Sequence, residues 1–154
     1  MRILAIDTST SWCSVALSFD GQIKHRHELI GAGASQHLLP WINELLHSVS
    51  AQYQDLDAIA VGIGPGAFTG VRLSVAIAQG LAVGAKRPVI PVASLDAMAM
   101  QVVQSNTFQR SSPAADTQFL IALDARMGEV YWARYQVNPM FNQSPKRIGE
   151  ITLS

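Results

Sequence analysis

The chain has 154 residues, of which 49% are hydrophobic and only 14% are charged. Lysine plus arginine and aspartate plus glutamate balance at 11 each, so no excess of positive charge indicates nucleic-acid binding by this chain alone. Its single cysteine, Cys13, excludes a disulfide framework and a cysteine metal cluster. We see no signal-peptide pattern, and we expect a cytoplasmic protein that covers apolar surface with a partner.

The first 30 residues predict three strands joined as a β-meander. The stretch "ILAID" is typical of a buried strand that ends in an acid, and "TSTS" of the turn after it. Residues 14–19 alternate between apolar and polar side chains, and Asp20-Gly21 is a strong hairpin signal. Residues 22–30 are therefore expected to form the third strand.

Helices and strands alternate over the next part of the chain. Apolar residues between positions 36 and 49 recur at helical spacing, and "LDAIAVGIG" predicts the strand that follows. Residues 68–84 predict a second helix, "RPVIPVA" predicts a short strand, and residues 94–104 predict a third helix. The polar stretch "SNTFQRSSPAADT" then indicates a linker or exposed loop.

The end of the chain repeats the plan of its beginning. "ILAIDTSTSWCSVAL" and "LIALDARMGEVYWAR" both consist of an apolar strand, an acid, a polar turn and an outgoing strand, which indicates a duplicated fold. The second copy has no room for the helices of the first. We therefore expect a first lobe over residues 1–104, a linker over 105–117 and an incomplete second lobe over 118–154.

The stretch "GIGPGAFTGV" has the glycines of a phosphate-binding loop but not its other residues. No lysine stands between Lys24 and Lys86, which excludes a Walker loop. No acid stands between Asp57 and Asp96, so the match to G-x-G-x-x-[GA] lacks the carboxylate that binds ribose. We interpret these glycines as a tight turn from a strand into a helix.

The helix predicted over residues 68–84 is apolar on nearly all sides. Two stripes of small residues run along it at a spacing of four: Ala76, Gly80 and Gly84, and Gly70, Ser74 and Ala78. A glycine inside a helix costs about 1 kcal/mol relative to alanine, which is understandable where another backbone must come close. We expect the helix to be buried on more than one side, against its own sheet and against a second helix or protein.

An acid at the end of the first strand, with the turn after it, forms a candidate nucleotide loop. Actin-like and Hsp70-like ATPases place an Asp there and follow it with a Gly-Thr phosphate hairpin, whereas Ser9 stands here where the glycine would be. We interpret Asp7, Thr8, Ser9 and Asp124 as a vestigial nucleotide loop. An independent nucleotide-hydrolysing enzyme that uses Asp7 and Asp124 is the alternative.

Four stretches carry a resemblance to a known family. "MRILAIDTST", "GPGAFTGVRLSVAIAQGLA", "PVASLDAMA" and "LDARMGEVYWARY" closely resemble the TsaB (YeaZ) family of bacterial threonylcarbamoyl-adenosine tRNA modification. The resemblance implies an α/β fold of two RNase H-like lobes with mixed sheets, as in the actin-like ATPase superfamily. It also implies a non-catalytic partner of TsaD, the metal-bearing subunit that transfers the threonylcarbamoyl group to adenosine 37 of tRNAs reading ANN codons.

The resemblance also implies that this chain lacks the metal site of TsaD. TsaD carries "NHMEGH" after a short strand, and the comparable stretch here, "VASLDAM", places Ser94 and Met98 at the histidine positions. A hydroxyl and a thioether cannot replace two imidazoles for a hard or borderline metal, so no catalytic or metal-binding residue is expected. His25 and His27 share one face of the third strand without a third ligand, which favours a solvated strand face over a metal site.

The helices over residues 36–49 and 68–84 are expected to pack against the matching helices of TsaD. The predicted partner interface consists of Leu38, Ile42, Gly70, Val71, Ser74, Val75, Ala78, Gly80 and Leu81. The resemblance implies a homodimer through the same surface when TsaD is absent, TsaE as an additional ATPase, tRNA contact only through the complex, and no membrane. No cofactor is expected, although ATP or ADP at the partner interface stays open.

Overall fold

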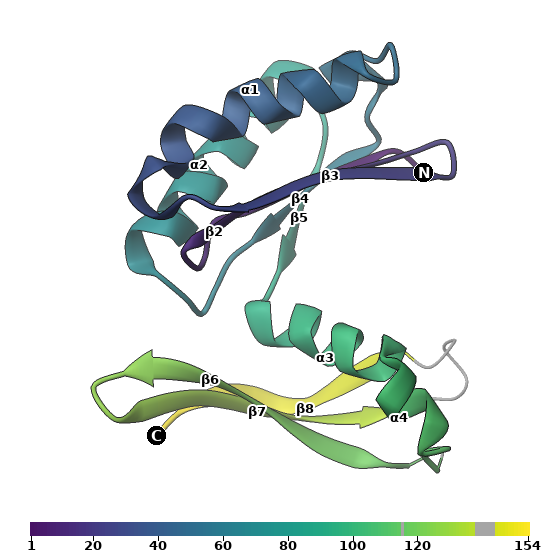
Figure 1. Cartoon of the computed structure of the whole chain (residues 1–154), viewed down its shortest axis with the longest axis vertical. Helices are drawn as coiled ribbons and strands as arrows, with labels where there is room; N and C mark the ends of the chain where they lie inside the picture. Colours follow the sequence, from purple (N-terminus) through teal and green to yellow (C-terminus); the bar gives the residue numbers. More distant parts are fainter. Residues whose placement is uncertain (115, 138–143) are drawn as a thin grey trace. The chain divides into compact units, whose positions relative to one another are not determined.

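The computed structural model describes residues 1–154 except 115 and 138–143, and contacts divide the chain into two units, Met1–Val92 and Ala93–Ser154 (Figure 1). Unit 1 contains a five-stranded mixed sheet in the order β3-β2-β1-β4-β5, in which β1 is antiparallel to β2 and parallel to β4. Its strands are β1 (Ile3–Asp7), β2 (Trp12–Phe19), β3 (Gln22–Leu29), β4 (Ala58–Gly62) and β5 (Val89–Val92). The predicted meander is confirmed by this sheet.

Two helices cover one face of this sheet, and the core of unit 1 lies beneath them. They are α1 (Ala34–His47) and α2 (Phe68–Ala85), and short 3-10 turns lie at Gly31–Gly33 and Tyr53–Asp55. Figure 1 shows both helices on the same side of the strands. Side chains alternate along a strand, so Leu4 and Ile6 of β1 point into one core cluster with Leu38 and Ile42 of α1 and Ala78 of α2.

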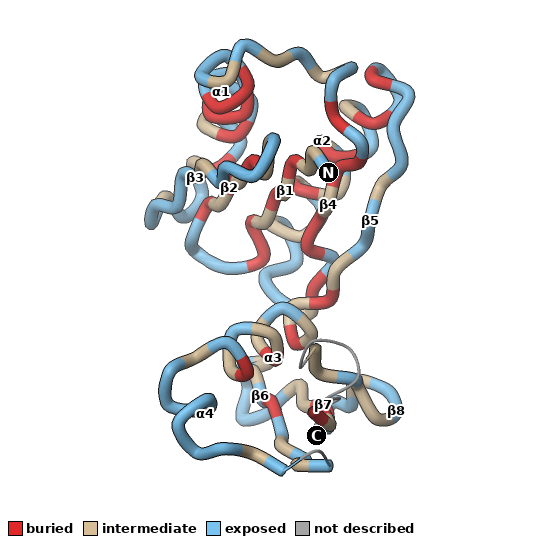
Figure 2. Tube along the Cα trace, turned by 90° about the vertical axis from the view of Figure 1, so that its right-hand side faces the viewer, coloured by how far each residue is buried: buried red, intermediate tan, exposed pale blue. Residues whose placement is uncertain are grey.

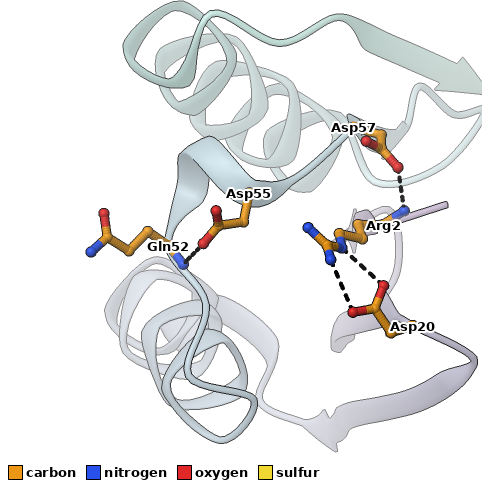
Figure 3. A network of polar contacts seen from close by, with 5 residues as sticks. All are labelled: Arg2, Asp20, Gln52, Asp55 and Asp57. Atoms are coloured by element: carbon orange, nitrogen blue, oxygen red, sulfur yellow. Dashed lines mark hydrogen bonds and ion pairs between the residues drawn. The ribbon is translucent and has the colours of Figure 1, made fainter.

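Arg2 ties the hairpin and the approach to β4 to the beginning of β1 (Figure 3). Its backbone N–H donates to Asp57 Oδ2 at 2.7 Å, and its guanidinium donates to both carboxylate oxygens of Asp20 at 2.9 and 3.0 Å. The hydrogen bond from Arg2 lowers the pKa of the Asp20 carboxyl. Nearby, Gln52 N–H donates to Asp55 Oδ2 at 2.8 Å and closes the turn before β4. The positively charged residue therefore joins three segments of unit 1.

Unit 2 is a three-stranded antiparallel sheet with a helix packed on one face. Its elements are α3 (Ser94–Gln104), α4 (Asn106–Arg110), β6 (Gln118–Arg126), β7 (Glu129–Val137) and β8 (Pro145–Leu153). Leu95 and Ala99 of α3 share a core cluster with Ile121, Ala133 and Tyr135 of the sheet. An inward apolar face on each strand produces this core, because alternate side chains point to opposite sides of a sheet.

A polar network fixes α3 to two strands of unit 2. The Tyr135 hydroxyl donates to Asp96 Oδ1 at 2.7 Å, and Arg147 Nη1 donates to the same oxygen at 3.2 Å. Burial is the main cause that raises the pKa of the Tyr135 hydroxyl, with Asp96 adding to it. The tyrosine therefore stays protonated and acts as the donor of this contact.

The division between the units differs from the boundary expected at residue 104. Helix α3 groups with the second unit because its apolar residues pack on β6, β7 and β8. The segment expected as a linker, 105–117, contains α4, whose first turn is capped by the Ser105 side chain accepting from Phe108 N–H. Residue 115 of that segment lies outside the described residues.

Candidate functional site

Helix α2 separates its two stripes of small residues onto opposite faces. Ser74, Ala78, Ala82 and Ala85 are buried against the sheet. The residues on the opposite side, which we call the outer face of α2, are exposed: Phe68, Thr69, Arg72, Ala76, Gln79, Gly80, Val83 and Gly84. By length and composition α2 is apolar enough to cross a membrane. Its inner face packs on β1, β4 and β5, which is how a helix packs in a protein core.

The inner stripe begins where the β1–β2 loop touches α2. A Cβ atom at Gly70 would lie 1.8 Å from the Thr8 carbonyl oxygen, and one at Gly66 would lie 2.4 Å from that of Ser9. The Thr8 hydroxyl donates to the Gly70 carbonyl at 2.6 Å, and Ala67 N–H donates to the Ser9 carbonyl at 2.6 Å. The close backbone approach inferred from the glycines is therefore made, at this end of α2, by the chain itself.

The small residues of the outer stripe, Ala76, Gly80 and Gly84, are not explained by a close backbone approach inside unit 1. A Cβ atom at Gly80 or Gly84 would meet nothing within 4 Å, and Val83 beside them is 80% exposed. Phe68 is 69% exposed, and the Arg72 guanidinium lies 3.7 Å from the centre of its ring. The outer face of α2 is thus smooth, mostly apolar and carries one charge, which makes it the candidate docking surface of this unit.

The structure divides the nine residues of the predicted interface. Four of them are fully buried in the core of unit 1: Leu38, Ile42, Ser74 and Ala78. Another four are partly buried: Gly70, Val71, Val75 and Leu81. Gly80 is exposed on the outer face of α2. The buried residues cannot contact a partner while unit 1 is folded, so the surface that α2 offers is its outer face.

Sequence reasoning missed Phe68, Ala76 and Val83, which lie on that outer face. A signal for the assignment was present in the chain. The stripe through Gly70, Ser74 and Ala78 continues at Ala82 with the same spacing, whereas the other stripe is flanked by Arg72 and Gln79. A polar flank marks the solvent side of an amphipathic helix.

The candidate nucleotide loop is occupied by its own chain. Asp7 Oδ1 accepts from the backbone N–H and from the hydroxyl of Ser9, each at 2.8 Å. Thr8 and Ser9 are buried, and the Ser9 carbonyl is bonded to α2 as described above. A phosphate loop needs free backbone N–H groups that point at the ligand. Asp124 belongs to unit 2, where its Oδ1 accepts from Arg126 N–H at 2.7 Å.

Of the two histidines on β3, His27 contacts neighbouring side chains of the sheet, and His25 is exposed. His27 Nδ1 lies 2.6 Å from Ser14 Oγ, and its ring stacks on Trp12 with centroids 4.5 Å apart. Outside residues 115 and 138–143, no three His, Cys, Asp or Glu side chains lie together as metal ligands. Cys13 is buried, and burial raises the pKa of its thiol to about 11, so the thiol is kept from becoming a nucleophilic thiolate.

Comparison with known proteins gives a consistent set of relatives. The family model that matches is described as TsaD, tRNA N6-adenosine threonylcarbamoyltransferase, and it covers residues 28–142. The tRNA threonylcarbamoyladenosine biosynthesis protein TsaB of Escherichia coli (strain K12) is 47% identical over 136 residues, which are 88% of this chain and 55% of that protein. The protein of the same name from Haemophilus influenzae is 42% identical over 134 residues, or 87% and 53% of the two chains.

Solved structures agree with these sequence relatives. YeaZ from Pseudomonas aeruginosa has a TM-score of 0.84 at 37% identity, over 99% of this chain and 66% of that one. A second structure, with a TM-score of 0.85 at 37% identity and the same coverage, is described as an uncharacterized protein similar to peptidase YEAZ. The predicted RNase H-like, actin-like fold is confirmed. The chain spans about half the length of the two curated relatives above.

Proposed function

Because the chain belongs to the TsaB (YeaZ) branch of the TsaD family, we propose that it takes part in making threonylcarbamoyladenosine in tRNA as a non-catalytic partner of TsaD. The observation that carries this proposal is the outer face of α2, a smooth apolar surface with no cover inside unit 1. In the larger complex TsaE supplies an ATPase, and tRNA is reached through the complex as a whole.

Two features support a role without catalysis. On the alignment with the TsaD histidine motif, Ser94 and Met98 stand where TsaD has two metal-binding histidines, and neither side chain binds a borderline metal as an imidazole does. In unit 1, the loop after β1 is bonded to α2 through Thr8 and Ser9. Chemistry is therefore left to TsaD, and any ATP or ADP binds at the partner interface.

The outer face of α2 suits a helix of the partner. Small side chains at Ala76, Gly80 and Gly84 allow a second helix to approach to the short end of the usual interaxial range, about 8 Å. Leu39 of α1, which is 43% exposed, is a further exposed apolar residue on the helices of unit 1. With Arg72 as the one charge on the outer face of α2, little desolvation of ionised groups opposes the contact.

The test is co-purification with the cognate TsaD, combined with a tRNA modification assay with and without this chain. Gly80→Arg places a large charged side chain on the outer face of α2, and we expect it to abolish TsaD binding and to reduce modification. Gln101→Arg adds the same charge on the exposed side of α3 and serves as the matched control. Far-UV circular dichroism should be unchanged in both variants. Undiminished binding by Gly80→Arg would overturn the interface.

The alternative of an independent ATPase has less support, since Asp7 already accepts two hydrogen bonds from Ser9. ATP turnover by the purified chain that disappears in Asp7→Asn would favour this alternative. Turnover that requires TsaD, and that survives Asp7→Asn, would favour the non-catalytic role.

A further inference from the structure

A pocket of about 700 Å³ opens at the surface of unit 1, where α1 ends and the chain turns toward β4. Helix α1 supplies Pro40, Asn43, Glu44 and His47, which recur at helical spacing and so share one face. Residues 51–54 contribute most of the remaining lining, and Figure 2 shows the chain after α1 as mostly exposed or intermediate. The volume falls within the range of about 300–1,000 Å³ that is typical of ligand sites.

The pocket is held in shape by bonds within unit 1. The Tyr53 hydroxyl donates to Asn43 Oδ1 at 2.7 Å, which ties the turn after α1 to the helix. Burial raises the pKa of this hydroxyl, so it keeps its proton and stays the donor. Arg87 Nη2 donates to the Gln54 carbonyl at 2.6 Å, and Ala51 packs against the core cluster of unit 1. The pocket is therefore already formed in the chain by itself.

The features of the pocket that would attract a cation are already used. The Glu44 carboxylate forms an ion pair with Arg26 of β3. The end of a helix attracts positive charge to its last carbonyls, but the carbonyl of Ser48 after α1 already accepts from Lys24 Nζ at 2.9 Å. Among the described residues that line the pocket, none is a lysine or an arginine that could hold an anion. An uncharged group is therefore favoured, because a buried charge needs a partner.

The remaining chemistry of the pocket suits an aromatic ring with a polar edge. Pro40, Leu46, Ala51 and the ring of Tyr53 supply apolar surface. Arg26 bonds to Oε1 of Glu44, which leaves the second carboxylate oxygen to accept from a ligand. We propose that the pocket receives a tyrosine or tryptophan side chain of the protein that docks on the outer face of α2, and that its O–H or N–H donates to Glu44 Oε2. Such side chains combine a large apolar area with one hydrogen-bond donor.

The pocket adjoins one end of the candidate docking surface. The 3-10 turn Tyr53–Asp55 contacts α2, and Arg87, which bonds to Gln54, lies two positions after α2 ends at Ala85. Gly84, the last small residue of the outer stripe, belongs to the same end of the helix. Aromatic anchors that fill pockets carry much of the binding energy of interfaces. The choice of partner rests on the proposed function, whereas the preference for an aromatic ring rests on the pocket alone.

The first experiment titrates single capped amino acids into the purified, isotope-labelled chain and follows its amide chemical shifts. N-acetyl-tyrosinamide and N-acetyl-tryptophanamide are the probes, and N-acetyl-leucinamide and N-acetyl-argininamide are the controls. We expect the aromatic probes to shift the signals of the residues that line the pocket, and to bind about tenfold more tightly than either control. Shifts scattered over the surface, or an arginine control that binds as tightly as the aromatic probes, would overturn the proposal.

Two substitutions separate the pocket from the ion pairs of Arg26. Glu44→Ala removes the acceptor from the pocket, and Glu28→Ala removes the other carboxylate beside Arg26, which lies on β3 outside the pocket. We expect Glu44→Ala to weaken the aromatic probes by about tenfold, because a hydrogen bond to a charged acceptor is lost. Glu28→Ala should leave them within about twofold of wild type. The circular dichroism of both variants should match wild type, and equal weakening by both would contradict the proposal.

The same variants are then measured for binding to the cognate TsaD. We expect Glu44→Ala to weaken TsaD binding by about tenfold and Glu28→Ala to leave it unchanged. Undiminished TsaD binding by Glu44→Ala overturns the assignment of the pocket to this partner. The two proposals fail separately. A chain that binds TsaD but no aromatic probe refutes the pocket alone, whereas a wild-type chain that binds the probes and not TsaD refutes the proposed function.

Discussion

The loop after β1 and the turn after β6 follow one sequence plan and end in opposite environments. In unit 1 Asp7 accepts a hydrogen bond from Ser9 N–H, and Thr8 and Ser9 are buried because Gly66 and Gly70 let the loop backbone reach α2. In unit 2 Asp124 accepts a hydrogen bond from Arg126 N–H, and Met127 at the tip of the turn is 99% exposed. A repeated local pattern therefore predicts the same turn chemistry, but the packing of the turn is decided by what the rest of the chain brings to it.

The largest effect on the buried loop of unit 1 is expected from Gly70→Ala. The new Cβ atom would lie 1.8 Å from the Thr8 carbonyl oxygen, and we expect a loss of about 3 kcal/mol in the free energy of unfolding of unit 1. Chemical denaturation measures this loss. Gly80→Ala, on the outer side of the same helix, should instead gain about 1 kcal/mol because it meets no neighbour and improves helix propensity. Equal effects at the two glycines would contradict the assignment of the faces.

A smaller effect is expected when the loop loses a single hydrogen bond. Thr8→Val removes the hydroxyl that donates to the Gly70 carbonyl. Valine has nearly the same shape as threonine, and residue 8 is only 2% exposed in the wild type, so little else should change. We expect a loss of about 1 kcal/mol, the typical net contribution of one intramolecular hydrogen bond, because the Gly70 carbonyl lies inside α2 and keeps its helical donor. The corresponding change in unit 2, Asp124→Ala, removes an exposed bond to Arg126 N–H and should cost about 0.5 kcal/mol. Thermal unfolding of both variants, each measured against the wild type, compares the two losses of stability.

The single cysteine, Cys13, reports on unit 1 alone through the pH dependence of stability. The pKa of the Cys13 thiol is raised to about 11 by burial, so the unfolded chain loses its proton first as the pH rises. The stabilisation is complete below the unfolded pKa and declines above it, by about 1 kcal/mol between pH 8.5 and pH 10. Cys13→Ala should show a smaller decline over this interval. A pH profile that is identical in the two proteins would show that the thiol is accessible in the folded state.

Much of the fold follows from local patterns in the sequence. The Asp20-Gly21 turn, with φ of 48° and 85°, predicts the hairpin because few residue pairs adopt this geometry. The helical spacing of Leu38 and Ile42 correctly predicts α1, and the same spacing should have placed both residues in the core. The interface prediction failed at these positions because an apolar stripe shows only that a face is covered, not by what.

The remaining features depend on contacts between distant residues. The β1–β2 loop packs against the inner stripe of α2, and the residues of this contact, Thr8 and Gly70, are 62 positions apart. Helix α3 joins the second unit through contacts such as Tyr135 with Asp96, 39 positions apart. Local sequence patterns do not contain such long-range pairings. The turn after β1 was therefore predicted, but its packing against α2 was not.

The bonds of Arg2 have a consequence for the order in which the chain assembles during synthesis. Its contact with Asp20 spans 18 positions and its contact with Asp57 spans 55. Loop closure is faster and less costly in entropy for the shorter span, and an emerging chain presents the nearer partner first. The antiparallel side of β1 can therefore be completed while its parallel side still waits for β4, so the nascent chain carries an open sheet edge that the finished unit 1 has closed.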